Sequence, residues 1–284
     1  MQGSPAVSPL SRRRTAASDW LLPLALGVLA LLFVSPFALM IVSAFKTQAE
    51  VLRTPPTFLP LEPTLNAFVT VLRDAPYGLW YRNSMVVACA VTAAVLVTSS
   101  LAGYVFAKFE FPGKRVLFLL VLSTMMIPFP VLLIPTYLIV DRMELLNTLW
   151  ALIIPGMVSA FGIFLMRQFI AGIPNDLIEA ARIDGASEWS IWARIIVPLV
   201  RPALAALGVF SFLASWNDYL WPLVAINETE RSTVPLALAF FNTAHAQRYD
   251  VIMAAATLAV VPVLVVFLIF QRQIVKALVL AGMK

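Results

Sequence analysis

The chain has 284 residues, of which 61% are hydrophobic and 12% charged. An ordinary soluble domain carries roughly 25% charged residues, so this composition excludes a soluble protein and is typical of a single membrane-embedded bundle. The formal net charge is +5, and the single cysteine and single histidine exclude an intrachain disulfide and argue against a thiol or histidine-rich metal site.

Six stretches are apolar enough to cross a bilayer, which takes about 20 residues. In chain order they are Trp20–Phe45, Ser84–Ala107, Val116–Val140, Thr148–Ile170, Ala203–Ala225 and Val251–Phe270. Residues 20–271 are therefore predicted to form one six-span domain between the tails 1–19 and 272–284. The first stretch follows three arginines, as a secretory signal would, but it is long for such a signal and no A-x-A-like cleavage site follows. We expect an uncleaved anchor.

The basic residues predict the orientation of these spans. With the N-terminus in the cytoplasm, the inner segments hold Arg12, Arg13, Arg14, Lys108, Lys114, Arg115, Arg167, Arg182, Arg194, Arg201, Arg272, Lys276 and Lys284. The outer loops hold the smaller set Lys46, Arg53, Arg73, Arg82, Arg142, Arg231 and Arg248. Cytoplasmic loops of membrane proteins carry the excess of Lys and Arg. Both termini are therefore expected in the cytoplasm, and the charge is read as topology rather than as a nucleic-acid site.

Prolines and small residues mark irregular and closely packed places. The first outer loop, 46–82, is rich in proline and aromatic residues, which predicts an ordered but irregular loop with short helical pieces. The third span contains Pro128, Pro130 and Pro135, which favours either a broken helix beside a cavity or a bent packing helix. The pairs Ser99 with Gly103 and Gly156 with Ala160 have the spacing that lets helices approach closely.

Residues 173–199 interrupt the apolar chain with a compact charged segment. Asn175 can cap a helix in which Glu179 and Arg182 form an i, i+3 pair. Gly185 suits a left-handed turn, and Ser187 can cap a second short helix. The apolar side chains that project from this hairpin are expected to be Ile183, Trp189, Trp192 and Ile196. Physical reasoning leaves two interpretations open, which are a helix that docks in a groove of another protein and an amphipathic hairpin on lipid headgroups.

The spacing within this segment resembles the EAA loop of ABC-importer permeases. That loop has the pattern E-A-A-x3-G-x9-I-x-L-P, and the chain departs from it only by Val197 in place of leucine. The resemblance implies that the first short helix is a coupling helix that sits in a cleft of an ATP-binding subunit, where Glu179 faces a basic residue. The coupling residues implied in this way are Glu179, Ala180, Ala181, Arg182, Asp184, Gly185, Ile195 and Pro198.

A looser resemblance covers about residues 20–284. The stretches MMIPFPVLLIPTYLI, LLNTLWALIIP and SWNDYLWPL are similar to the carbohydrate group of these permeases. The resemblance implies an all-α integral membrane protein of the bacterial inner membrane, with the six-helix bundle of a type I ABC importer. The implied partners are a second homologous permease, two ATP-binding subunits and an extracytoplasmic solute-binding protein, within membrane lipid.

Nucleotide chemistry is expected outside this chain. No G-x-x-x-x-G-K-[ST] phosphate loop is present, so the chain is expected to bind no cofactor, with ATP and magnesium on the partner ATPases. No metal site and no catalytic residue are predicted.

Polar residues in the fifth span suggest a solute path, because charges inside a span are costly. Ser211, Ser215 and Asp218 have the spacing of one helical face. The candidate path residues are Ser211, Ser215, Trp216, Asn217, Asp218 and Tyr219, with aromatic rings for the apolar face of a sugar. The alternative is that Asn217 and Asp218 cap a broken helix or tie two permeases together. The loop 227–250 is predicted to re-enter the membrane or lie on the outer surface, with His245 as an ordinary loop residue.

The sequence allows three alternatives to a sugar permease to be weighed. The solute could be a glycerol-phosphate ester rather than a sugar. A secondary transporter would need coupling-ion or proton sites, and a membrane enzyme would need paired titratable groups at one depth, whereas the spans supply essentially Asp218 alone.

Overall fold

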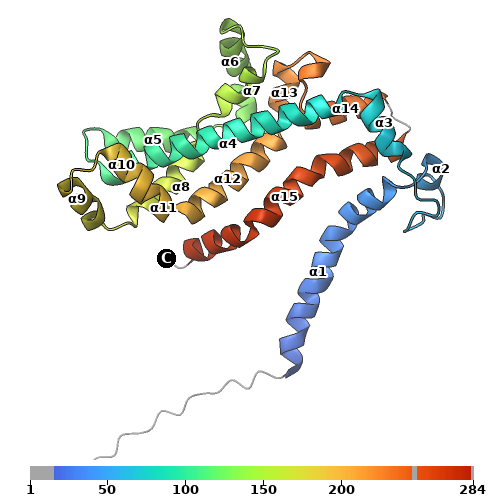
Figure 1. Cartoon of the computed structure of the whole chain (residues 1–284), viewed down its shortest axis with the longest axis horizontal. Coiled ribbons are helices and arrows are strands. Elements are labelled where there is room, and N and C mark those ends of the chain that lie inside the picture. Colours follow the sequence, from blue (N-terminus) through green and yellow to red (C-terminus); the bar gives the residue numbers. More distant parts are fainter. Residues whose placement is uncertain (1–15, 245–247, 283–284) are drawn as a thin grey trace, which may run out of the picture.

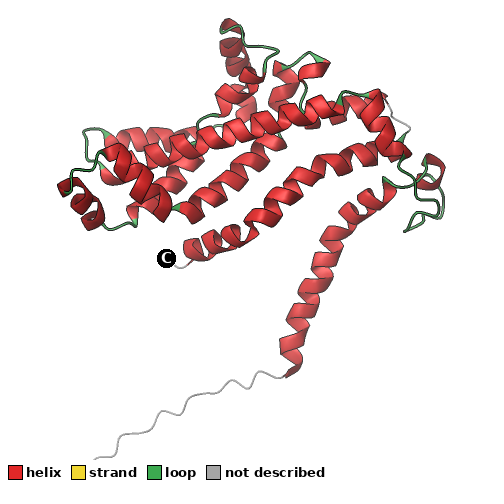
Figure 2. Ribbon diagram, in the orientation of Figure 1, coloured by secondary structure: helices red, strands yellow, loops and turns green. Residues whose placement is uncertain are grey.

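The computed structural model describes the backbone of residues 16–244 and 248–282, and the side chains of residues 20–239 and 248–271. Every regular element in that part of the chain is a helix (Figure 2). The helices are α1 (Ala16–Ser43), α2 (Gln48–Val51), α3 (Asn66–Asp74), α4 (Tyr77–Lys108), α5 (Lys114–Thr124), α6 (Phe129–Arg142), α7 (Leu149–Ile153), η1 (Ile154–Gly156), α8 (Ala160–Ala171), α9 (Asn175–Ile183), α10 (Glu188–Ile191), η2 (Trp192–Ile196), α11 (Val197–Leu199), α12 (Arg201–Trp216), α13 (Leu220–Ala225), η3 (Thr229–Arg231), α14 (Val234–Ala244) and α15 (Tyr249–Gly282).

Three helices are long and apolar enough to cross a membrane alone, at Trp20–Ser43, Tyr77–Lys108 and Tyr249–Gln271. Three bent pairs pass the same test only when each pair is taken as one span, which brings the number to six among the described residues. The helix α4 lies along α8 and α12, while α1 contacts α15 near its C-terminal end and otherwise extends away from the bundle (Figure 1). No residue in the most apolar window of this span is buried, so most of the surface of α1 is open to lipid or to another subunit.

The third predicted span is broken rather than bent. The helices α5 and α6 meet at an angle of 101°. Pro128 lies at the N-cap of α6, where its missing N–H and fixed φ fit the start of a new helix. The next residue, Phe129, lines a cavity, so the expectation of a broken helix beside a cavity is confirmed.

The fifth predicted span, Ala203–Ala225, is a broken helix, as the capping alternative for Asn217 and Asp218 predicts. The helix α12 ends at Trp216 and α13 starts at Leu220. The Asn217 side chain donates a hydrogen bond to the carbonyl of Leu213 at 2.8 Å, and the Asp218 carboxylate accepts one from the N–H of Trp221 at 3.4 Å. Short polar side chains that bond to nearby backbone groups compete with the helix, which explains the break.

Small residues bring α4 and α8 into direct contact, as their spacing predicts. A Cβ atom at Gly103 would lie 2.7 Å from the Cβ of Met166, and one at Gly162 would lie 2.3 Å from the Oγ of Ser99. Both distances are shorter than van der Waals contact, so only glycine fits. A Cβ at Gly156 would lie 3.2 Å from a methyl group of Val91, which is also a close approach.

The loop between α1 and α4 is ordered and irregular, as predicted, with α2 and α3 as its helical pieces. Its centre is Glu50, a buried carboxylate that accepts hydrogen bonds from the Thr57 hydroxyl at 2.8 Å and the Leu61 N–H at 2.9 Å. Burial acts to raise the pKa of Glu50, but these hydrogen bonds and the charge of Lys46 hold it below its ordinary value.

The predicted re-entrant or surface loop 227–250 contains the helix α14, which packs against α4 and α15. Val234 and Ala237 are fully buried there. His245 lies outside the described residues.

Candidate functional site

The segment 173–199 forms the predicted helix, turn and second helix. The helix α9 ends at Ile183, and Gly185 has a φ of +80°, in the left-handed region that favours glycine. Ser187 caps α10, since its hydroxyl accepts the N–H of Ser190 at 3.3 Å. The predicted capping role of Asn175 is wrong, because Pro174 holds the N-cap position and Asn175 is the first helical residue. The Asn175 side chain instead accepts a hydrogen bond from Lys108 at 2.7 Å, which ties α9 to the end of α4.

One face of this hairpin is anchored and the other is free. Ile178 is buried in the main hydrophobic core, whereas Ile183 is 86% exposed and Trp189 is 62% exposed. Ile196 is fully buried and Trp192 is half-buried, so the expectation that they project from the hairpin is wrong. The free surface combines apolar side chains with charges, which suits a helix that enters a groove of another protein.

The predicted coupling residues divide between these two faces. Exposed positions are Glu179, Ala180, Arg182, Asp184 and Gly185, and half-buried positions are Ala181, Ile195 and Pro198. Ala181 and Ile195 pack against the main hydrophobic core. The second group therefore supports the hairpin from beneath, and the first group forms its accessible surface.

An ion pair that sequence reasoning missed holds the hairpin together. The Arg182 Nε lies 2.7 Å from a carboxylate oxygen of Glu188, and the other oxygen accepts a hydrogen bond from the buried Tyr104 hydroxyl at 2.6 Å. The expected pair of Glu179 with Arg182 is wrong, because Glu179 has no ion pair among the described residues. Glu188 thus joins α9, α10 and α4. Glu188 lies in the first turn of α10, and nothing in the local sequence indicates Tyr104 as its partner.

A cavity of about 320 Å³ lies between α4, α12, α13 and the segment from α7 to α8. Ser211, Ser215 and Asp218 all line it, so these three candidate residues come together although Asp218 lies beyond the end of α12. Trp221 and Phe129 also line the cavity, and their rings lie edge to face at 6.3 Å. Sequence reasoning missed Phe129, which lies far from the fifth span in the sequence.

Three other candidate residues do not line the cavity. Trp216 is fully buried, and its indole N–H donates to the carbonyl of Ala259 at 3.1 Å. Asn217 bonds to the backbone of α12, and Tyr219 is exposed outside the cavity lining. The capping alternative therefore describes the contacts of Asn217, the C-cap residue of α12, while Asp218 accepts a hydrogen bond from the N–H of Trp221 and also lines the cavity.

The cavity lining combines hydroxyl groups, aromatic rings and one acid. Asp218 is the one ionisable residue among the described residues that line it, and Ser159 adds a third hydroxyl. No lysine or arginine of the described chain contributes to this lining. Such a surface can accept and donate hydrogen bonds to hydroxyl groups and pack a ring against an apolar sugar face.

Comparison with known proteins identifies the family. Residues 97–279 match the family described as "Binding-protein-dependent transport system inner membrane component". The chain belongs to this family. It is therefore a permease subunit of an ABC importer and a multi-pass protein of the inner membrane, and the family is a transport family rather than a catalytic one.

Relatives of the permease match it over nearly their whole length. The arabinooligosaccharide transport permease AraQ of Halalkalibacterium halodurans is 34% identical over 97% of this chain and 100% of the relative. The lactose transport permease LacG of Rhizobium radiobacter is 35% identical, over 89% and 92%. The sn-glycerol-3-phosphate transport permease UgpE of Salmonella typhi is 34% identical, over 90% and 93%.

A solved structure has the same fold. A chain of a bacterial ABC transporter involved in the import of the acidic polysaccharide alginate superposes with a TM-score of 0.81, covering 95% of the permease and 99% of that chain. At 24% sequence identity this likeness concerns the fold. The predicted type I importer bundle is thereby confirmed.

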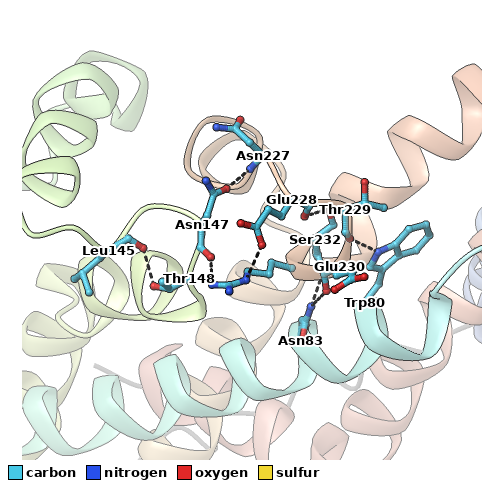
Figure 3. A network of polar contacts seen from close by, with 11 residues as sticks. Trp80, Asn83, Leu145, Asn147, Thr148, Asn227, Glu228, Thr229, Glu230 and Ser232 are labelled. Carbon is cyan, nitrogen blue, oxygen red and sulfur yellow. Dashed lines mark hydrogen bonds and ion pairs between the residues drawn. The ribbon is translucent and has the colours of Figure 1, made fainter.

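Polar contacts join α7 and α13, which both contribute residues to the lining of the permease's cavity, and part of this network is drawn in Figure 3. Asn147, at a φ of +57°, accepts the N–H of Asn227 through its side chain at 2.6 Å, and its carbonyl accepts a hydrogen bond from Arg231. The indole of Trp221 also donates to the carbonyl of Ala151 at 2.9 Å. Because Ala151 lies in α7 and Trp221 in α13, these bonds hold the two helices as one unit.

A second part of the same network ties this unit to α4. The Asn83 amide donates to the carbonyls of Glu230 at 2.8 Å and Ser232 at 3.1 Å, and the Trp80 indole donates to the carbonyl of Thr229 (Figure 3). These residues are far apart in the sequence, and no motif pairs them. Sequence reasoning therefore could not find them.

Proposed function

We propose that the permease forms one half of the path of an ATP-driven importer for a sugar or a related polyhydroxylated solute. A solute-binding protein delivers the solute, a second homologous permease completes the path, and two ATPase subunits supply the energy. The proposal is supported by family membership and by relatives that carry arabinooligosaccharides and lactose. A solved structure with the same fold is in complex with a periplasmic protein bound to an alginate pentasaccharide.

The exposed hairpin carries the coupling part of this proposal. The helix α9 presents Ile183, Glu179 and Asp184 to solvent, and its base is held to α4 through Glu188 and Lys108. A subunit that moves α9 therefore moves the end of α4 at Lys108. The same helix lines the cavity further along, at Val91 and Val95. Rocking of packed bodies between two states would then open the path on alternate sides. In this arrangement both termini and α9 are cytoplasmic.

The composition of the cavity favours a neutral solute over a phosphate ester. An anion beside Asp218 would meet a carboxylate with no lysine or arginine among the described lining residues. Like charges at about 4 Å repel by about 4 kcal/mol where the effective dielectric constant is about 20. A hydroxylated neutral solute instead gains hydrogen bonds from Asp218 and the serines.

The test is to purify the permease with the subunits that accompany it and to reconstitute the complex in lipid. ATP hydrolysis is then measured with the solute-binding protein and either a neutral oligosaccharide or sn-glycerol 3-phosphate. Stimulation by the oligosaccharide and none by the ester supports the proposal. Isolation of an active transporter without any ATPase would overturn it, and stimulation by the ester alone would overturn the solute class.

A further inference from the structure

A cationic pocket lies beside the turn that joins α4 to α5, and the proposed function does not use it. The pocket has a volume of about 630 Å³. Its lining includes Lys114, Arg115, Arg167 and the ring of Phe118. Glu110 is the one acid among the described lining residues, and it pairs with Lys114 at 2.9 Å. The lining therefore carries an excess of two positive charges.

Two arginines of this pocket lack a counter-ion within the described part of the chain. Neither Arg115 nor Arg167 forms an ion pair there. Arg167 is half-buried, its guanidinium lies 4.3 Å from the centre of the Phe118 ring, and its Nε donates to the carbonyl of Phe106 at 3.4 Å. These contacts fix the guanidinium, and among the described residues its terminal nitrogens have no hydrogen-bond partner. A fixed guanidinium fork matches the oxygens of a phosphate group.

The surface that continues from the pocket is aliphatic. The helix α5 starts at Lys114, and Val116, Leu117, Leu119 and Leu120 on it are all exposed. Cations at the start of an apolar helix meet the boundary between headgroups and acyl chains in a bilayer. A ligand that fits both surfaces carries an anionic phosphate at one end and a hydrocarbon chain at the other.

We propose that this pocket binds the headgroup of an anionic phospholipid, with an acyl chain lying along α5. Arg115 and Arg167 bind the phosphate, and Phe118 holds Arg167 in place. Arg167 lies in α8, which leads through a short turn into α9. The bound lipid therefore braces the base of the coupling hairpin.

The test counts bound lipids on the purified full chain with its accompanying subunits, in nanodiscs of phosphatidylcholine with or without phosphatidylglycerol. Native mass spectrometry measures the phosphatidylglycerol that is retained. Arg115→Gln and Arg167→Gln are each expected to lower its retention about fivefold. The matched control is Arg201→Gln, an exposed arginine outside the pocket, and it should retain the lipid. Arg167→Gln could fail to fold, because Arg167 packs on Phe118. In that case the result for Arg115→Gln decides the test.

Three results would overturn the proposal. Equal retention of phosphatidylglycerol and phosphatidylcholine shows that the pocket does not select an anionic lipid and that its basic side chains are simply hydrated. Displacement of phosphatidylglycerol by millimolar inorganic phosphate shows a site for free anions instead of a lipid. Failure of Arg115→Gln to lower retention also overturns it, and a crosslink of Arg115→Cys to another subunit through a bifunctional thiol reagent then shows that the pocket is a subunit contact.

Discussion

The contact between Tyr104 and Glu188 is expected to be the strongest single tie between the coupling hairpin and the bundle. Tyr104→Phe removes the hydroxyl that donates to Glu188 at 2.6 Å and leaves the ring in place. Because Tyr104 is buried and Glu188 is ionised, the lost hydrogen bond should cost about 1.5–3 kcal/mol in the free energy of unfolding.

The neighbouring ion pair should contribute less. The side chains of Arg182 and Glu188 are 40% and 44% exposed. Exposed pairs of this kind contribute about 0.2–1 kcal/mol. Arg182→Gln should therefore destabilise the protein less than Tyr104→Phe. This holds although Arg182 lies 2.7 Å from Glu188, nearly as close as the Tyr104 hydroxyl at 2.6 Å.

Equilibrium unfolding of the purified protein in mixed detergent micelles measures these differences. Tyr137→Phe is the matched control, because Tyr137 is half-buried and its hydroxyl has no partner within the described chain. A double-mutant cycle of Tyr104→Phe with Glu188→Gln should give a coupling energy of about 1 kcal/mol or more. The reasoning is refuted if the two variants are additive, or if Arg182→Gln is the more destabilising change.

Three further predictions follow from the close contacts, the turn and the cavity. Gly103→Ala should lower the free energy of unfolding by about 1–3 kcal/mol, because its Cβ would meet Met166 at 2.7 Å, whereas Gly78→Ala, with no atom within 4 Å, should not destabilise the protein. Gly185→Val should abolish solute uptake without loss of membrane insertion, and Gly185→Asn should keep uptake, because asparagine tolerates a φ of +80° better; equal uptake by both would contradict the turn argument. Asp218→Asn should raise the KM for uptake about tenfold at unchanged amounts of assembled complex, and an unchanged KM would return Asp218 to a capping role.

Local chemistry in the sequence predicted the elements that depend on it. Gly185 and Ser187 define a turn and a cap from their own backbone and side-chain preferences, and the structure has both. The small residues Ser99 and Gly103 predicted a close helix contact, which α8 provides. Hydrophobic runs likewise predicted where apolar helices lie.

Features that depend on distant residues could not be predicted in this way. The role of Glu188 is one example, since its partner Tyr104 is distant in sequence. Of the predicted path residues, Ser211, Ser215 and Asp218 line the cavity, while Trp216 faces the core, because helical spacing gives a face but not its neighbour.

The central claim is that an ATPase subunit docks on α9, and site-directed crosslinking tests it most directly. In a background with Cys89 replaced by alanine, cysteine is introduced at Ile183, which is 86% exposed on α9, and at Leu59, an exposed residue of the loop between α1 and α4, as the control. A bifunctional reagent in intact cells should link Ile183→Cys, and not Leu59→Cys, to a nucleotide-binding subunit, and ATP should change the yield. The absence of a crosslink from Ile183→Cys, or an equal yield from Leu59→Cys, would contradict the account.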